Sequence, residues 1–84
     1  MVRESFVVRD ASGLHLRPAA RLSEAALEFR CRVTLLHGKT EANAKSVLGI
    51  LAACVRSGDA VTLVCDGPDE ETTMEALRKI MADV

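Results

Sequence analysis

A histidine and an arginine lie two positions apart, just before a proline, in the stretch 13–18 (GLHLRP). Proline is favoured in the first turn of a helix, because its fixed φ suits the helix and the N–H that it lacks would have no partner there. Gly13 permits a tight turn before that helix. We therefore expect His15 at a helix N-terminus, where free backbone N–H groups and the helix dipole favour an anion. This position predicts a histidine that carries a phosphoryl group.

The chemistry expected at His15 is attack on phosphorus by a neutral imidazole. The unperturbed pKa of histidine is about 6.5, so a ring with a free lone pair is available at physiological pH. We expect the backbone N–H groups of Leu16 and Arg17, and the Arg17 guanidinium, to donate hydrogen bonds to the phosphoryl oxygens. The sequence has no nucleotide-binding loop and no convergent Mg²⁺ ligands, so neither a cofactor nor a metal is expected. These residues predict a carrier that one partner phosphorylates and another dephosphorylates, and not an enzyme.

A second unusual stretch, residues 45–55 (KSVLGILAACV), contains a good helix N-cap at Ser46. The residues after Ser46 are apolar on every side of a short helix, and a chain of 84 residues has little with which to cover them. We expect Leu48 and Leu51 to be exposed as a binding patch. The alternative is a helix buried at the centre of the protein. Taken alone, Ser46 is only a helix cap.

Size and composition exclude several classes of protein. The 84 residues predict one domain, 1–84, and 49% hydrophobic with 27% charged residues is ordinary for a folded chain. A net charge of −1, with no Trp or Tyr, gives no support for nucleic-acid binding. The sequence begins with a mixed segment and has no apolar run of membrane-spanning length. We therefore expect a cytoplasmic protein that binds neither nucleic acid nor membrane.

The three cysteines and the second histidine predict no further site. Cys31, Cys54 and Cys65 lie in apolar segments without a Cys-x-x-Cys spacing, so we expect buried thiols in a reducing compartment. Cys31 and His37 lack two further ligands for a metal. His37 lies at a turn with no companion residues beside it, so we expect a structural or incidental histidine.

The remaining pattern predicts the elements that position these residues. Alternating apolar residues predict strands, and apolar residues at helical spacing predict helices. The expected strands are 5–9, 31–36, 40–44 and 61–66, and the expected helices are 18–29, 47–55 and the segment that follows an N-cap at Asp69. Apolar residues on both faces of 61–66 indicate a central strand. The order βαββαβα and its short connections predict an α+β open-faced sandwich, a four-stranded antiparallel sheet with three helices on one face.

The stretch 13–19 (GLHLRPA) closely resembles the active-site motif of HPr, the histidine-containing phosphocarrier of the bacterial phosphoenolpyruvate-dependent phosphotransferase system. The stretch 45–49 (KSVLG) resembles the regulatory-serine segment of that family, and the resemblance extends over essentially the whole chain. The resemblance implies that enzyme I phosphorylates Nδ1 of His15, with phosphoenolpyruvate as the original donor. The phosphoryl group would then pass to a IIA protein or domain, for sugar uptake or regulation, with Arg17 stabilising the phosphate.

The resemblance also implies which surfaces meet partners. Enzyme I and IIA would contact, in turn, a set of small and apolar side chains: Leu16, Ala20, Val47, Leu48 and Leu51. Ser46 would be phosphorylated by an HPr kinase/phosphorylase, and a transcriptional regulator would read that state. A monomer is expected.

Some residues depart from the pattern of the sugar-transport members. Leu16 is bulkier and more apolar than the expected Thr or Ala, and Glu24 and Leu27 stand where those members often have basic residues. Glu24 and residues 67–68 are similar to the nitrogen-related branch, whereas the stretch 45–49 favours the serine-regulated branch. Both branches stay open. A hypothesis from another class is a regulatory binding module, whose effectors read the phosphorylation of His15 or Ser46.

Overall fold

The computed structural model describes residues 1–84 as four strands and three helices that alternate along the chain. Their bounds are β1 (Val2–Val7), α1 (Leu16–Leu27), β2 (Arg32–His37), β3 (Thr40–Asn43), α2 (Val47–Ala52), β4 (Ala60–Asp66) and α3 (Glu70–Met81). The strands form one sheet in the order β1-β4-β2-β3, and every neighbouring pair is antiparallel. The expected α+β open-faced sandwich is confirmed.

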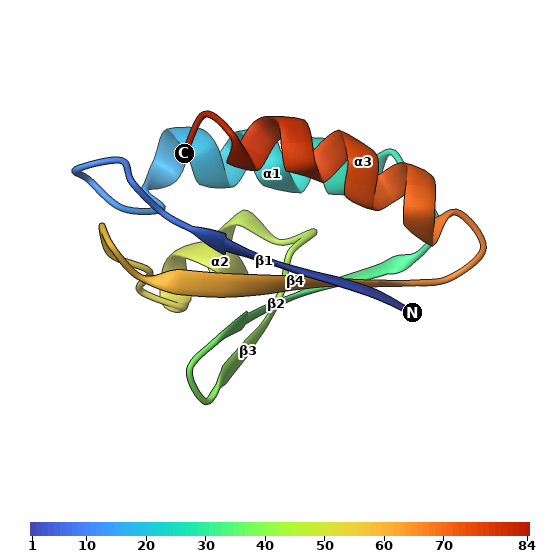
Figure 1. The fold of residues 1–84 in the computed structure, drawn as a ribbon, viewed down its shortest axis with the longest axis horizontal. Helices are drawn as coiled ribbons and strands as arrows, with labels where there is room; N and C mark the ends of the chain where they lie inside the picture. Colours follow the sequence, from blue (N-terminus) through green and yellow to red (C-terminus); the bar gives the residue numbers. More distant parts are fainter.

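The helices lie on one face of the sheet and leave the other face open. α1 and α3 run side by side above the sheet, whereas the shorter α2 packs against α1 and β3 at one end (Figure 1). β4 lies between β1 and β2, as its two apolar faces predict. Val61, Leu63 and Cys65 are buried beneath the helices, and Val64 is buried on the opposite face of the same strand.

The helical spacing of apolar residues in α1 and α3 places them over the sheet. Ala19, Leu22 and Ala26 of α1 are fully buried. On α3, Leu77 is fully buried and Met74 is almost fully buried. They belong to a single hydrophobic cluster that also contains the inward side chains of the strands. This core holds the two long helices against the sheet, so the position of the first turn of α1 is well defined.

Strand β1 begins three residues earlier than predicted, at Val2 instead of Ser5. Glu4 interrupts the apolar alternation, but it lies on the inward face at the edge of the sheet, where Arg78 of α3 binds it. The Arg78 Nε and Nη2 groups donate hydrogen bonds of 2.7–3.0 Å to both Glu4 carboxylate oxygens. The N–H groups of Arg78 lower the pKa of Glu4, so this carboxylate stays ionised on the strand.

Helix α2 ends at Ala52, three residues before the predicted end. The prediction that Cys54 is buried is therefore wrong. Cys54 has a φ of +53°, a left-handed conformation that terminates the helix, and its side chain is exposed. Cys31 and Cys65 are buried as expected. Burial raises the pKa of the Cys65 thiol to about 12, which keeps it protonated and unreactive.

Asp69 ties the end of α1 to the start of α3. It occupies the N-cap position of α3, as predicted, but its side chain makes no cap hydrogen bond. The carboxylate instead accepts hydrogen bonds from the N–H groups of Arg30, at 2.8 Å, and Cys31, at 2.9 Å. These N–H groups hold the pKa of Asp69 below its usual range, and that of Arg30 has the larger effect.

Replacement of Asp69 by asparagine is expected to lower the melting temperature at neutral pH and to make stability less dependent on acid. Because the pKa of Asp69 is depressed in the folded chain, its contribution is complete above the unfolded value of about 3.9 and disappears as pH falls through the native value. The melting temperatures of Asp69→Asn and the parent chain, followed from pH 7 downwards, should therefore begin to converge once the pH falls below about 4. Asp83→Asn serves as the control, because Asp83 only faces Arg21 on the surface at 3.6 Å. A constant difference in melting temperature across this pH range would contradict the assignment.

Candidate functional site

His15 occupies the N-cap of α1, with extended backbone angles (φ −81°, ψ −170°). Its carbonyl oxygen accepts the N–H of Ala19 at 3.0 Å, but no side chain caps the helix. The backbone N–H groups of Leu16 and Arg17 have no acceptor within the chain, and Pro18 has no N–H. Two free donors therefore point out of the helix beside the imidazole, where the helix dipole also favours an anion.

The loop before His15 has a fixed shape. Gly13 has a φ of +68°, and any Cβ at this position would overlap the carbonyl oxygen of Val55. The same oxygen accepts the N–H of Leu14 at 3.0 Å, and the Leu14 side chain is buried. The turn after α2 thus supports the histidine loop from below, and only glycine allows this close approach.

The imidazole itself is accessible. The His15 side chain is 40% exposed, and its Nε2 lies 3.3 Å from a carboxylate oxygen of Asp10. Nδ1 has no hydrogen-bond partner within the chain. Arg17 is exposed and forms no ion pair, so its guanidinium is available to an incoming anion.

The predicted partner surface lies on α1 and α2, which pack together. Leu16 and Leu48 are strongly exposed, by 63% and 78%. The other members of the predicted surface are half-buried: Ala20, Val47 and Leu51. We call these five residues the apolar patch. Only Ile50 of α2 is buried, so the alternative of a fully buried helix is wrong, although Leu51 is less exposed than expected.

Ser46 caps α2 as predicted. Its Oγ accepts the N–H of Gly49 at 3.0 Å, and its carbonyl oxygen accepts that of Ile50. A buried serine of α1 joins the two helices, because the Ser23 hydroxyl donates to the carbonyl oxygen of Lys45 at 2.9 Å. Ser46 thus lies directly after Lys45, the residue that Ser23 of α1 binds.

His37 has a structural role away from His15, in keeping with the expectation of a histidine that is structural or incidental. Its Nδ1 donates to the carbonyl oxygen of Ala53, and its Nε2 lies 2.9 Å from a carboxylate oxygen of Asp59. The hydrogen bond from the N–H of Arg56 lowers the pKa of Asp59, and the contact with His37 lowers it further. This cluster holds the turn after α2, which in turn supports Gly13. No local pattern could reveal it, because the partners lie 16 and 22 residues away.

Asp10 is a second residue that the sequence analysis did not select for the site. Its approach to His15 spans five residues of loop, and its own carboxylate also accepts the N–H of Ser12 at 2.9 Å. An acidic residue two positions before a serine is a common turn signal, and it does not indicate a contact with a histidine five positions later.

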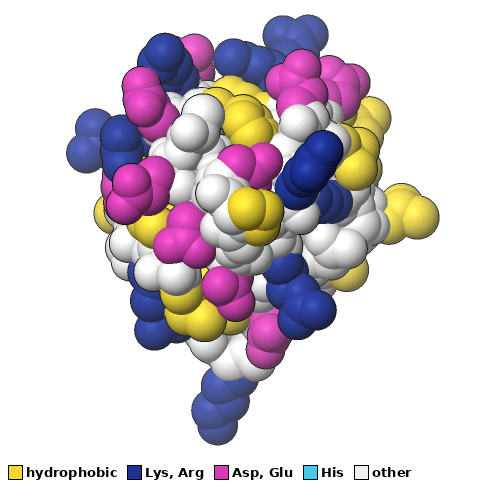
Figure 2. Space-filling model, turned by 90° about the vertical axis from the view of Figure 1, so that its right-hand side faces the viewer, with side chains coloured by type: hydrophobic (Ala, Val, Ile, Leu, Met, Phe, Trp, Pro, Cys, Tyr) yellow, Lys and Arg dark blue, Asp and Glu magenta, His cyan; other side chains and the backbone are white.

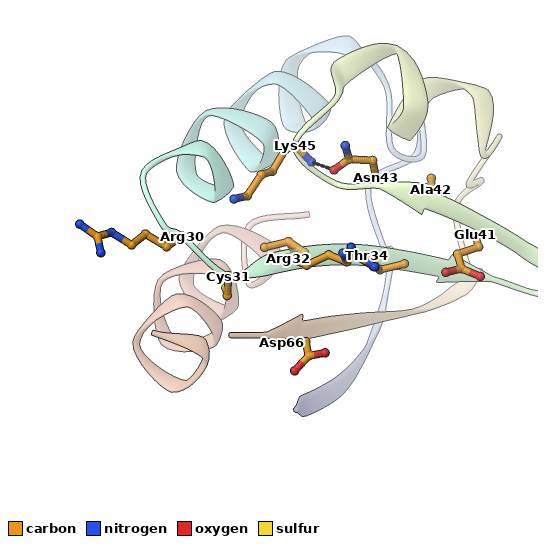
Figure 3. Close-up of a pocket in the computed structure, with 10 residues that line it drawn as sticks. Arg30, Cys31, Arg32, Thr34, Glu41, Ala42, Asn43, Lys45 and Asp66 are labelled. Carbon is orange, nitrogen blue, oxygen red and sulfur yellow. Dashed lines mark hydrogen bonds between the residues drawn. The ribbon is translucent and has the colours of Figure 1, made fainter. Parts of the chain in front are cut away.

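The opposite end of the molecule has a different character. The face in Figure 2, which is the right-hand end of Figure 1, shows interspersed acidic and basic side chains and no histidine. The largest hollow, of about 970 Å³, is open and mostly polar, and its lining includes Arg32, Glu41, Lys45 and Asp66 (Figure 3). The Nζ of Lys45 donates a hydrogen bond of 2.8 Å to the carbonyl oxygen of Phe29, so this cation of the hollow already has a structural role. His15 does not line this hollow.

The fold and the site together define a class: a small open-faced sandwich that presents an exposed histidine at a helix N-terminus, next to an apolar patch. Residues 2–83 match the family described as the phosphotransferase-system HPr component, phosphorylation site. The chain belongs to this HPr family of phosphocarrier proteins of the phosphotransferase system.

Individual relatives agree with this assignment. The chain is 30% identical to the phosphocarrier protein HPr of Mycoplasma capricolum, over 99% of this chain and 93% of the relative. A solved mycoplasma histidine-containing phosphocarrier protein superposes with a TM-score of 0.95, at 29% identity over 98% of this chain and 93% of that one. The Bacillus subtilis catabolite repression protein Crh, solved as a swapped dimer, has a TM-score of 0.78 at 35% identity, over 99% and 95% of the two chains. No helix of this chain is both long enough and apolar enough to cross a membrane.

Proposed function

We propose that the chain accepts a phosphoryl group from enzyme I on Nδ1 of His15 and passes it to IIA proteins or domains. The observation that carries this proposal is the pair of free N–H groups of Leu16 and Arg17 beside an exposed imidazole. These donors and the Arg17 guanidinium bind the phosphoryl oxygens after transfer. The protein acts once per phosphoryl group, as a carrier with a covalent intermediate and no cofactor.

The apolar patch is the docking surface for both partners in this proposal. Leu16 is the first residue of α1, and Leu48 is the most exposed large apolar side chain of the chain. Exposed leucines beside a reactive group favour burial against a partner, which also excludes water from the transferred phosphoryl group. Each partner supplies the missing half of the active site when it docks. The proposed carrier works in the cytoplasm as a monomer, while the swapped dimer of Crh makes the oligomeric state a quantity to measure.

The experiment is phosphoryl transfer in two stages. Incubation with phosphoenolpyruvate and enzyme I should give one acid-labile phosphoryl group per chain, which is the behaviour of a phosphohistidine. The purified phosphorylated chain should then lose this group to a IIA domain after enzyme I is removed. Sugar-type and nitrogen-type IIA domains, tested in parallel, distinguish the two branches of the family. A chain that enzyme I does not label would contradict the proposal.

The second candidate function is regulatory binding, which the similarity to the catabolite repression protein Crh favours. In that case Ser46, phosphorylated by an HPr kinase/phosphorylase, would control docking on a transcriptional regulator. Slow transfer to every IIA domain, with tight binding of a regulator that depends on the phosphorylation of Ser46 or His15, would favour this function.

Replacement of Ser46 by aspartate is expected to slow the phosphorylation of His15 by about tenfold, through the negative charge that it places beside the docking surface. Aspartate is itself a good N-cap, so α2 should keep its structure. Ser46→Asn is the matched control, because asparagine caps the helix without a charge and should change the rate by less than about twofold. The initial rate of labelling by enzyme I measures both. Equal rates for the two variants would mean that Ser46 is only a helix cap.

A further inference from the structure

The carboxylate of Asp10 is directed at one particular nitrogen of the proposed acceptor. Its Oδ2 lies 3.3 Å from Nε2 of His15, on the side of the ring opposite to the free Nδ1. The His15 side chain is 40% exposed and that of Asp10 is 36% exposed, so a partner can reach the ring without displacing the carboxylate. The contact joins a titratable pair inside the loop that precedes α1.

The loop backbone holds Asp10 in this position. Its Oδ1 accepts the N–H of Ser12 at 2.9 Å, and its carbonyl oxygen accepts the N–H of Gly13 at 2.8 Å. Its own N–H donates to the carbonyl oxygen of Val84 at 3.0 Å. The backbone of Asp10 is thus fixed by two hydrogen bonds, and its side chain cannot turn away from His15 without losing the hydrogen bond from Ser12.

The charge of Asp10 decides which way the hydrogen bond runs. The N–H of Ser12, and secondly His15, hold the pKa of the carboxyl group below its usual range, so it is ionised at neutral pH. An ionised carboxylate only accepts hydrogen bonds, so Nε2 must carry the ring proton. The lone pair of a neutral ring then lies on Nδ1, which has no hydrogen-bond partner within the chain.

We propose that Asp10 is a positioning residue that holds His15 in the Nε2–H tautomer and so makes Nδ1 the nucleophile. The inference rests on the proposed function and adds to it the reason for the choice of nitrogen. In the transfer, the Nδ1 lone pair forms a bond to phosphorus, and the bond from phosphorus to the donor protein breaks with its electron pair leaving on the donor. Nε2 keeps its proton, so the ring gains a positive charge, which the Asp10 carboxylate stabilises.

The decisive variant is Asp10→Asn. The N–H of Ser12 keeps the asparagine oxygen where Oδ1 now lies, so the amide NH₂ faces Nε2 of His15. A donor at this place favours a lone pair on Nε2, and the tautomer should shift towards Nδ1–H. Two-bond ¹H–¹⁵N correlations of the unphosphorylated chain, recorded with the ring in its neutral form, report the tautomer directly. The rate of labelling by enzyme I should fall on the order of tenfold.

Two further variants separate this role from a change in the loop or in net charge. Asp10→Ala removes both the acceptor and any donor, so its tautomer ratio should lie between those of the parent and Asp10→Asn. Asp83→Asn makes the same change in charge without touching His15, and both its tautomer and its rate should match the parent.

An unchanged tautomer in Asp10→Asn would overturn the inference, whatever the labelling experiment shows. A tautomer ratio of His15 that changes with the residue at position 10, as predicted, supports the inference even in the unphosphorylated chain. If such a chain is not labelled by enzyme I, the proposed function fails while the positioning role stands. If the chain is labelled but its tautomer ignores Asp10, only the positioning role fails.

Discussion

His15→Ala is expected to abolish labelling by enzyme I and phosphoenolpyruvate completely. Alanine has no nitrogen that could form the bond to phosphorus, and no other group stands at the free N–H groups of Leu16 and Arg17. The loss should exceed about a thousandfold, because the variant removes the atom that reacts and not a contact that assists it. The amount of acid-labile phosphate per chain, at long incubation with excess enzyme I, measures the result.

The second histidine provides the control for this variant. His37→Asn removes the only other imidazole, so its labelling must be kept if the assignment to His15 is right. We expect this variant to be less stable, because His37 binds Ala53 and Asp59, and circular dichroism should show that it is folded at the assay temperature. Acid-labile label that persists in His15→Ala would contradict the assignment.

Leu48→Asp is expected to lower the second-order rate constant of transfer by about 10- to 100-fold without changing stability. Leu48 is 78% exposed, so its replacement removes little from the hydrophobic core. The loss arises in the complex, where a buried leucine is replaced by a charge that must be desolvated. The dependence of the initial rate on the concentration of the variant, at fixed enzyme I, separates weaker docking from slower chemistry.

Val7→Asp is the matched control for the apolar patch. Val7 is 51% exposed on the open face of β1, away from the helices, so the same change in polarity falls on a surface with no expected partner. Its transfer rate should stay within about twofold of the parent, since surface changes away from a docking site have small effects. Equal losses in Leu48→Asp and Val7→Asp would argue against a docking role for the patch.

Local patterns predicted the fold well, because the elements of this chain depend on nearby residues. The proline of the first turn and the glycine before it placed the start of α1 within two residues, at Leu16 instead of Pro18. The two apolar faces of 61–66 predicted the central strand correctly. Ser46 was recognised as a cap because its partner, Gly49, is three residues away.

The features that were missed depend on contacts between distant residues. Glu4 lies in a strand that pairs with β4, and its carboxylate is bound by Arg78, 74 residues away. His37 has partners that only the packing of α2 on the sheet brings close. Cys54 is exposed because the chain turns through a left-handed residue, which apolar composition does not reveal. A pattern can therefore propose His15 as the reactive group, whereas the carboxylate beside it required the folded loop.

The most direct test of the account is to identify the atom that carries the phosphoryl group. The chain, labelled with ¹⁵N at histidine and phosphorylated by enzyme I and phosphoenolpyruvate, can be studied by NMR for coupling between phosphorus and nitrogen. The account predicts one phosphoryl group per chain, with coupling to Nδ1 of His15, and an unmodified His37. Coupling to Nε2 of His15, or a phosphoryl group on His37 or on an oxygen atom, would contradict it.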